Sequence, residues 1–298
     1  MDNTRRLPPA LVEHARSFLA EGRAPVTPRG AATVVLLRPA SGRYGGSPER
    51  GYGGSPLGGY GGSPEVYVLR RHLGMAFAAG MYAFPGGTVD PRDADRALAW
   101  AGPSPADWAE RLGCDEAAAR ALVCAAVRET FEESGVLLAG ADVDTVVADT
   151  TGEGWERDRA ALVDRSLAFA ELLDRRGLVL RTDLLTAWAH WITPEFEPRR
   201  YDTRFFVAAM PAGQRTRNVS GEADHVAWMT PAAALGGVDS GEMSMLPPTY
   251  VTLRDIGRLS SIDEVWRTAA GRTLTPVVPG VEITDDGALL TLPPEVGA

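Results

Sequence analysis

The sequence predicts an α/β protein, because strand patterns and helix patterns follow one another along a chain long enough for a substantial core. The 298 residues are 45% hydrophobic, which suffices for one well-cored domain with additions or for two small domains. No clear linker separates the candidate elements. We therefore expect one domain over residues 1–298, with a helix at 8–20, a Gly-rich loop at 40–64 and a C-terminal extension at 247–298.

The N-terminal part contains two strand patterns with a repeat between them. Residues 31–38 are β-branched and apolar and residues 65–71 alternate, so both segments are predicted strands. Tyr-Gly-Gly-Ser-Pro occurs at 44–48, 52–56 and 60–64, and this period is too short for a unit with a buried face. We expect a flexible loop that joins two paired strands, and a tyrosine-bearing binding loop is the alternative.

The remaining elements follow from periodicity and turn signals. Phe-Pro-Gly-Gly-Thr-Val-Asp at 84–90 predicts a loop. The expected helices span 94–101, 105–112, 155–176, 247–259 and 262–270. The expected strands span 185–192, 201–209 and 225–229, and an Asp-Gly turn predicts a hairpin over 281–292.

The clearest helix pattern begins at Asp115 and ends at Ser134. Asp115 is a favourable N-cap, good helix formers fill the segment, and apolar residues recur at helical spacing. Gly135 supplies the left-handed conformation that commonly ends a helix. The helix therefore stops directly after a group of glutamates.

Three of these glutamates share one face of the predicted helix, because Glu129 lies three residues before Glu132 and four before Glu133. Their like charges destabilise the helix unless a cation neutralises them. Mg²⁺ prefers carboxylate oxygens and bridges to substrate phosphates, where a metal can polarise a phosphoryl oxygen and activate water. We expect Arg128 to hold one glutamate by a charge-assisted hydrogen bond. The alternative interpretation is a solvated acidic helix face.

A glycine turn upstream completes a known pattern. Bare backbone at Gly86 and Gly87 could approach a metal or a phosphate closely. Gly87 together with Arg-Glu-Thr-Phe-Glu-Glu-Ser-Gly-Val at 128–136 resembles the Nudix box. The resemblance implies a Nudix-type α/β/α sandwich around a mixed β-sheet, and metal-dependent hydrolysis of a nucleoside diphosphate derivative with Mg²⁺ or Mn²⁺.

The resemblance also implies roles for individual residues. Glu129, Glu132 and Glu133 match the metal ligands of the family. Gly87 matches the glycine whose backbone lies near the metal, and Arg128 matches the arginine that positions a glutamate. We therefore expect Arg128 and the three glutamates to be catalytic.

The box is interrupted in this sequence. Gly87 and Arg128 are 128 − 87 = 41 residues apart, about 27 more than in the usual box, so residues 91–114 are interpreted as an insertion. The position where the box normally has its first glutamate is Arg120. Asp90 and Asp93 are weak candidates for that role, and the fourth acidic ligand remains open.

The interruption itself resembles the split box of the peroxisomal-type coenzyme A diphosphatases. Residues 126–138, and Trp-Ile-Thr-Pro at 191–194 followed by residues 199–206, support that branch. The resemblance implies hydrolysis of coenzyme A or acyl-coenzyme A to 3′,5′-ADP and (acyl)phosphopantetheine. The alternatives are a pyrophosphatase for ADP-ribose, NADH or another nucleotide, and a non-catalytic nucleotide-sensing module.

Further polar residues are candidates for substrate contacts or for the general base. Arg199 and Arg200 are the predicted phosphate contacts, since guanidinium matches phosphate geometry, and Arg204 is a weaker candidate. Ordinary surface arginines are the alternative. Four acidic residues near these segments are weak candidates for the base or for outer metal contacts: Glu195, Glu197, Glu222 and Asp224. Trp188, Trp191 and Phe196 are expected in the core rather than against an adenine.

Composition restricts the partners. The net charge is −9 and the pI is about 5.1, so neither nucleic acid nor an anionic membrane is an expected partner. All 30 cationic residues are arginines, which we attribute to composition bias. Two cysteines without metal-site spacing, no signal-peptide pattern and no run of 18 apolar residues favour a cytoplasmic protein. Dimerisation is common in the superfamily, so a homodimer is an expectation without a predicted interface.

Overall fold

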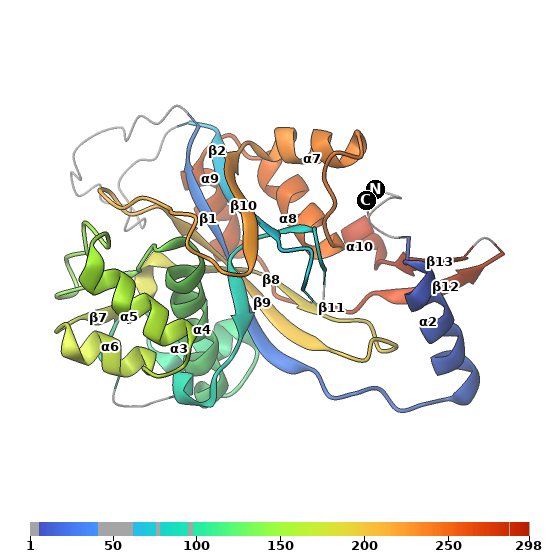
Figure 1. The fold of residues 1–298 in the computed structure, drawn as a ribbon, viewed down its shortest axis with the longest axis horizontal. Coiled ribbons are helices and arrows are strands. Elements are labelled where there is room, and N and C mark those ends of the chain that lie inside the picture. The colour runs from blue at the N-terminus through green and yellow to red at the C-terminus, as the bar shows by residue number, and fades with distance from the viewer. Residues whose placement is uncertain (1–5, 41–61, 76–77, 95–97, 286, 298) are drawn as a thin grey trace.

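The computed structural model describes residues 6–40, 62–75, 78–94, 98–285 and 287–297, and Figure 1 shows a central sheet with helices on both faces. The strands of this sheet are β1 (Arg29–Pro39), β2 (Pro64–Arg71), β3 (Tyr82–Ala83), β4 (Gly86–Thr88), β8 (Thr186–Ile192), β9 (Tyr201–Ala209), β10 (Ala223–Met229) and β11 (Pro276–Val277). Their order is β10-β2-β1-β9-β8-β11, with β3 paired to β2 and β4 paired to β1.

Strand β1 occupies the middle of the sheet because it is apolar on both faces. The side chains of residues 34–37 are fully buried, as a strand covered on both faces requires. β1 pairs in parallel with β9, with Val35 opposite Val207, and antiparallel with β2, with Leu37 opposite Val66. β8 and β11 also pair in parallel, while the remaining pairs of this sheet are antiparallel. The predicted mixed sheet is thus confirmed.

One helical layer covers the face of β1 that carries Val34 and Leu36. It consists of α3 (Pro105–Leu112), α4 (Glu116–Ser134), α5 (Glu153–Val163) and α6 (Phe169–Arg175). Val123 and Val127 of α4 belong to the same buried cluster as Val34 and Leu36. A small sheet of β5 (Trp100–Ala101), β7 (Val179–Arg181) and β6 (Ala139–Gly140) lies among these helices.

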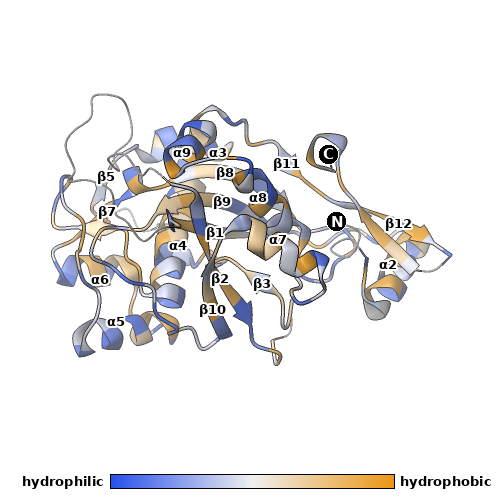
Figure 2. Ribbon diagram, turned by 90° about the horizontal axis from the view of Figure 1, so that it is seen from above, coloured by the Kyte–Doolittle hydropathy of each residue, from blue (hydrophilic) through white to orange (hydrophobic). Residues whose placement is uncertain are grey.

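A second helical layer covers the opposite face, where Val35 and Leu37 point. It consists of α7 (Pro231–Asp239), α8 (Pro247–Gly257) and α9 (Ile262–Gly271). Trp188 and Trp191 are buried in this second cluster, which confirms the core interpretation of both tryptophans. In Figure 2 the strands β8 and β9 are pale to orange, whereas the outer helix α5 carries blue hydrophilic segments.

The two ends of the chain meet in a third, smaller cluster. Helix α2 (Pro9–Glu21) packs against the hairpin of β12 (Gly280–Thr284) and β13 (Gly287–Thr291), beyond the sheet in Figure 1. Ala15, Phe196 and Leu290 are buried there. A short helix, α10 (Pro294–Gly297), follows the hairpin. None of the described helices combines the length and apolar character needed to cross a bilayer.

Most predicted elements are confirmed, and the errors occur where a local conformation interrupts a pattern. The predicted helix at 155–176 is two helices, because Arg165 has a positive φ of 64° between α5 and α6. The predicted helix at 94–101 is wrong at its end, where β5 pairs with β7. The predicted loop at 84–90 contains β4 and ends next to a short 3-10 helix, η1 (Pro91–Ala94). Helix α7 was not predicted.

The Gly-rich repeat lies mostly outside the described residues, so its predicted loop is untested over 41–61. The two strands that flank it are paired, as expected for the segments at its ends. Both cysteines are free, and Cys124 is buried in α4. Local signals thus place the sheet and α4, which together position the candidate active site.

Candidate active site

Helix α4 presents three glutamates near its C-terminal end. The Asp115 carboxylate caps the helix by accepting from the backbone N–H of Ala118 at 2.8 Å, as predicted. Gly135 adopts the left-handed conformation, with a φ of 76°, and ends the helix. Glu129, Glu132 and Glu133 therefore lie on the last two turns, beside β4. Glu129 and Glu132 line the cavity described below, whereas Glu133 is buried against Gly86.

Arg128 donates hydrogen bonds to three carboxylates, those of Asp93, Glu129 and Glu132, which together form an acidic cluster. Its Nη1 donates to Glu129 Oε1 at 2.8 Å and to Glu132 Oε1 at 3.1 Å. Its Nε and Nη2 donate to the two carboxylate oxygens of Asp93, at 3.0 Å and 2.9 Å, and Nη2 also donates to the Thr88 carbonyl. The geometry therefore agrees with the expectation that Arg128 holds a glutamate, and it adds a second glutamate and an aspartate.

Two glycines let strand β4 approach the carboxylates. The backbone N–H of Gly86 donates to Glu133 Oε2 at 2.8 Å. A Cβ atom on Gly87 would lie 2.5 Å from Glu129 Oε1, and one on Gly86 would lie 2.5 Å from the Ala32 carbonyl oxygen. A side chain at position 86 would collide with the backbone of β1, so this position requires glycine, whereas one at position 87 would displace the Glu129 carboxylate.

Burial makes the carboxylates hard to ionise. It raises the pKa of Glu129 to about 7, with the charge of Glu132 adding to the effect and Arg128 opposing it. Burial also raises the pKa of Glu133 well above its usual range, and the charge of Glu129 raises it further. The pKa of Glu132 is raised for the same reason, again opposed by Arg128. The one guanidinium in contact therefore does not offset the effect of burial on these pKa values.

The residues fit a hard divalent cation by donor chemistry and burial. Carboxylate oxygens are the protein ligands that Mg²⁺ and Mn²⁺ prefer, and the missing Cβ of Gly87 leaves backbone beside them. Across the described part of the chain, however, no three His, Cys, Asp or Glu side chains already converge on one point. Arg128 holds two of the carboxylates and Gly86 holds the third. Glu129, Glu132 and Glu133 are the residues that would hold a metal.

The cluster opens into a cavity of about 450 Å³ between α4, β4, the α5–α6 connection and the start of β9. Exposed guanidiniums line it at Arg92, Arg165 and Arg199, and Arg71 lines it from β2. Apolar side chains line it from the α5–α6 segment: Leu162, Val163 and Leu167. The cavity thus combines an acidic end, arginines suited to phosphate and an apolar wall.

The structure separates the predicted substrate residues. Arg199 lines the cavity, whereas Arg200 is buried and donates to the carbonyls of Thr193 at 3.1 Å and Val26 at 2.8 Å. Arg200 therefore joins backbone segments, and the prediction that it contacts substrate is wrong in this structure. Arg204 is also buried and pairs with Asp202 and His190.

The acidic candidates separate in the same way. Glu222 lines the cavity, but Glu195, Glu197 and Asp224 do not. Asp224 instead pairs with Arg70 at 2.6 Å. All four acidic residues precede predicted strands or tryptophans in similar loop segments, so the sequence did not distinguish the one that lines the cavity from the three that do not.

Asp93 and Arg120, the position where the Nudix box normally has its first glutamate, both contact other side chains. Asp93 is buried and binds Arg128, so it helps to orient that side chain. Arg120 stacks on the ring of Trp100 at 5.1 Å from its centroid and does not line the cavity. Asp90 lines the cavity and pairs with Arg92. Sequence reasoning missed Arg92 and Arg165, although Arg92 could have been noticed beside Asp90.

Comparison with known proteins bears on this geometry. The family model described as the NUDT19 Nudix domain matches residues 107–259, which are 153 of the 298 residues. The chain belongs to the Nudix hydrolase family. The match includes α4 with its three glutamates, whereas Gly87 and Asp93 lie before it. The predicted enzyme class is therefore confirmed.

Relatives and a solved structure agree with this assignment. A Xenopus laevis protein named acyl-coenzyme A diphosphatase NUDT19 is 27% identical over 186 residues, covering 57% of this chain and 49% of that protein. The Gallus gallus protein of the same name is 27% identical over 289 residues, covering 83% and 72%. The match to the Xenopus laevis protein thus spans about half the length of that protein. The crystal structure of a Nudix hydrolase from Alicyclobacillus acidocaldarius is 27% identical with a TM-score of 0.65, covering 84% of this chain and 99% of that chain.

Proposed function

We propose that this Nudix hydrolase cleaves the diphosphate bond of coenzyme A or acyl-coenzyme A, giving 3′,5′-ADP and (acyl)phosphopantetheine, with Mg²⁺ or Mn²⁺ as cofactor. The observation that carries the proposal is the cavity, in which Glu129 and Glu132 at one end face arginines and an apolar wall, with Glu133 buried directly behind them on α4. The names of the frog and chicken relatives support the same substrate class.

The cavity residues suit the parts of such a substrate. A diphosphate and a 3′-phosphate need several guanidiniums, and Arg92, Arg165 and Arg199 face the cavity. The pantetheine arm and an acyl chain need an apolar surface, which Leu162 and Leu167 supply. ADP-ribose lacks an acyl chain and a 3′-phosphate, so it would leave part of this lining unused.

The chain's own residues prepare the reaction by position and charge. A bound divalent metal would supply charge stabilisation at the phosphoryl oxygens and an activated water. Arg128 fixes Glu129 and Glu132, so their carboxylates are preorganised rather than free to rotate. Among the four acidic candidates for the base, Glu222 lines the cavity, and we propose that its carboxylate accepts the proton of the attacking water.

A screen with product identification tests the proposal. Purified protein with Mg²⁺ or Mn²⁺ is incubated with coenzyme A, acyl-coenzyme A, ADP-ribose, NADH and dinucleoside polyphosphates, and products are identified by mass. We expect 3′,5′-ADP from both coenzyme A substrates, at a higher kcat/KM than for the others. Cleavage of ADP-ribose or NADH with intact coenzyme A would overturn the substrate and retain the class.

A nucleotide-sensing module without catalysis is distinguished by a variant pair. Glu133→Gln removes a charge that the cation needs while keeping the shape of the side chain. Glu116→Gln makes the same change at an exposed position in the first turn of α4. Turnover by the unaltered protein and both variants that does not exceed background would favour the sensing module over the enzyme.

A further inference from the structure

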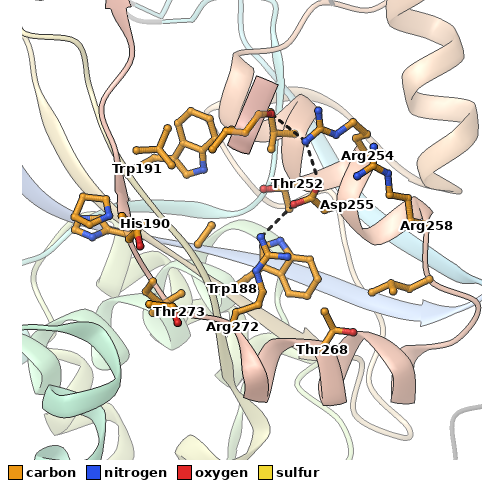
Figure 3. Close-up of a pocket in the computed structure, with 18 residues that line it drawn as sticks. Trp188, His190, Trp191, Thr252, Arg254, Asp255, Arg258, Thr268, Arg272 and Thr273 are labelled. Atoms are coloured by element: carbon orange, nitrogen blue, oxygen red, sulfur yellow. Dashed lines mark hydrogen bonds and ion pairs between the residues drawn. The ribbon is translucent and has the colours of Figure 1, made fainter. Parts of the chain in front are cut away.

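A second cavity, of about 500 Å³, lies on the opposite face of the sheet from α4 (Figure 3). Its walls come from β8, α8, α9 and the segment that leads from α9 into β11. Within the described part of the chain, it shares no lining residue with the candidate active site. Any ligand here would occupy a separate site.

The lining of this second cavity carries an excess of positive charge. Among the residues that the structure describes, three arginines line it, Arg254, Arg258 and Arg272, against a single carboxylate, Asp255. Asp255 accepts from Arg254 at 3.2 Å and from Arg272 at 3.1 Å. Arg258 is exposed and has no ion-pair partner among the described residues. The formal balance of these groups is 3 − 1 = +2, which favours an anion.

Unpaired polar atoms gather on the same wall. Five buried side-chain nitrogen and oxygen atoms lack a hydrogen-bond partner within the described residues, and three of the five lie here. They are Thr252 Oγ1 and the Nε and Nη1 atoms of Arg254. Thr252 is only 1% exposed, so its hydroxyl is a buried group without a protein partner. Nη2 of Arg254 is already engaged, because it donates to the Val296 carbonyl at 3.0 Å.

Buried donors without partners are costly, so their concentration at one place points to a ligand rich in acceptors. Figure 3 shows Arg254 and Thr252 on α8, Arg258 directly after this helix, and Arg272 from the segment that follows α9. Arg272 also lies over the Trp188 ring, 4.3 Å from its centroid, so the tryptophan and Asp255 both hold its guanidinium in place.

We propose that this cavity binds the phosphate group of a small phosphorylated molecule. A phosphate monoester offers several acceptor oxygens and up to two negative charges, matching the donors and the balance of +2. Trp191, Val251 and Leu259 supply an apolar wall for the organic part of the ligand. The volume falls within the range of roughly 300–1,000 Å³ found for small-molecule sites, which is more than one oxyanion needs.

Calorimetric titration with inorganic phosphate and phenyl phosphate tests the proposal. Arg258→Gln should weaken binding of both probes about tenfold, since it removes a charged hydrogen-bond donor at an exposed position. Thr252→Val should weaken binding severalfold without a change of shape. Arg267→Gln, at an exposed position of α9 outside the lining, should change nothing. Equal binding by Arg258→Gln and the unaltered protein would overturn the site.

Two further measurements locate the anion and test its organic part. Arg199→Gln removes a guanidinium of the active-site cavity and should leave this binding unchanged. Crystals soaked in tungstate should show an anomalous peak beside Arg254 and Thr252, and a peak only in the α4 cavity would overturn the assignment. Phenyl phosphate should bind more tightly than inorganic phosphate, and equal affinities would contradict a role for the apolar wall.

Discussion

On one face of the sheet, carboxylates surround the guanidinium of Arg128, whereas on the other face arginines surround the carboxylate of Asp255. Three carboxylates share the one guanidinium of Arg128, and two guanidiniums share the one carboxylate of Asp255, so in both groups the majority charge exceeds what the central residue can pair. Burial of unpaired charge is expensive, so each cluster calls for a ligand of the opposite sign. The comparison indicates a cation for the α4 cluster, which is Arg128 with its carboxylates. It indicates an anion for the α8 cluster, which is Asp255 with its arginines.

The largest expected effect comes from removing the central arginine of the α4 cluster. Arg128→Gln leaves Asp93, Glu129 and Glu132 without their shared guanidinium, and breaking such a buried pair costs about 3–5 kcal/mol. We expect a large fall in the free energy of unfolding, measured by urea denaturation in the presence of a chelator.

Arg120→Gln is the matched control on the same helix, since within the described residues Arg120 makes a cation–π contact to Trp100, worth about 0.5–1 kcal/mol at exposed sites. Saturating Mg²⁺ should restore part of the stability that Arg128→Gln loses. A loss no greater than that of the control would show that the carboxylates do not depend on a cation.

Glu133→Gln should have the next largest effect, on turnover. Loss of one preorganised charged group at a reaction centre typically lowers kcat about 10²–10³-fold. The metal-free variant should be no less stable than the unaltered protein, because the amide replaces a buried carboxyl whose ionisation is disfavoured by burial. Steady-state kinetics at saturating metal measures the first effect and thermal unfolding the second. A variant that loses stability but keeps its kcat would contradict the role of Glu133.

Metal addition should stabilise the protein by a smaller amount. A cation at one hundred times its Kd contributes about 2.7 kcal/mol to the folded state. We expect Mg²⁺ or Mn²⁺ to raise the Tm of the unaltered protein, to raise it less in Glu133→Gln, and to raise it fully in Glu116→Gln. A rise that is equal in all three proteins would place the metal elsewhere.

Sequence reasoning succeeded where the deciding interactions are local. The N-cap at Asp115, the stop at Gly135 and the shared face of the three glutamates lie within one helix, and the structure has all of them. The apolar run of β1 likewise predicted a strand, which the structure places in the middle of the sheet. Helix α7 was not predicted because it has only nine residues and two of them are glycines, which weaken a helix pattern.

The candidate site was less predictable because it joins distant segments. Asp93 reaches Arg128 across 35 positions, and no spacing rule indicates that its carboxylate faces the arginine rather than a metal. The second cavity is assembled from β8 and from helices that contain no recognisable motif. Its charge excess appears only when the fold brings Arg254, Arg258 and Arg272 together.

Substitutions of Arg199 and Arg200 should have the smallest effects on activity and stability. They give the sharpest test, because one neighbour should contact substrate and the other should hold the backbone. Arg199→Gln should raise KM about tenfold through loss of one phosphate contact, with kcat and Tm nearly unchanged. Arg200→Gln should lower Tm, because its buried guanidinium holds the carbonyls of Thr193 and Val26, and should leave KM unchanged. Parallel kinetic and thermal measurements on the two variants decide the matter. If both raise KM alike, the side-chain directions at the start of β9 are wrong and the substrate contacts must be reassigned.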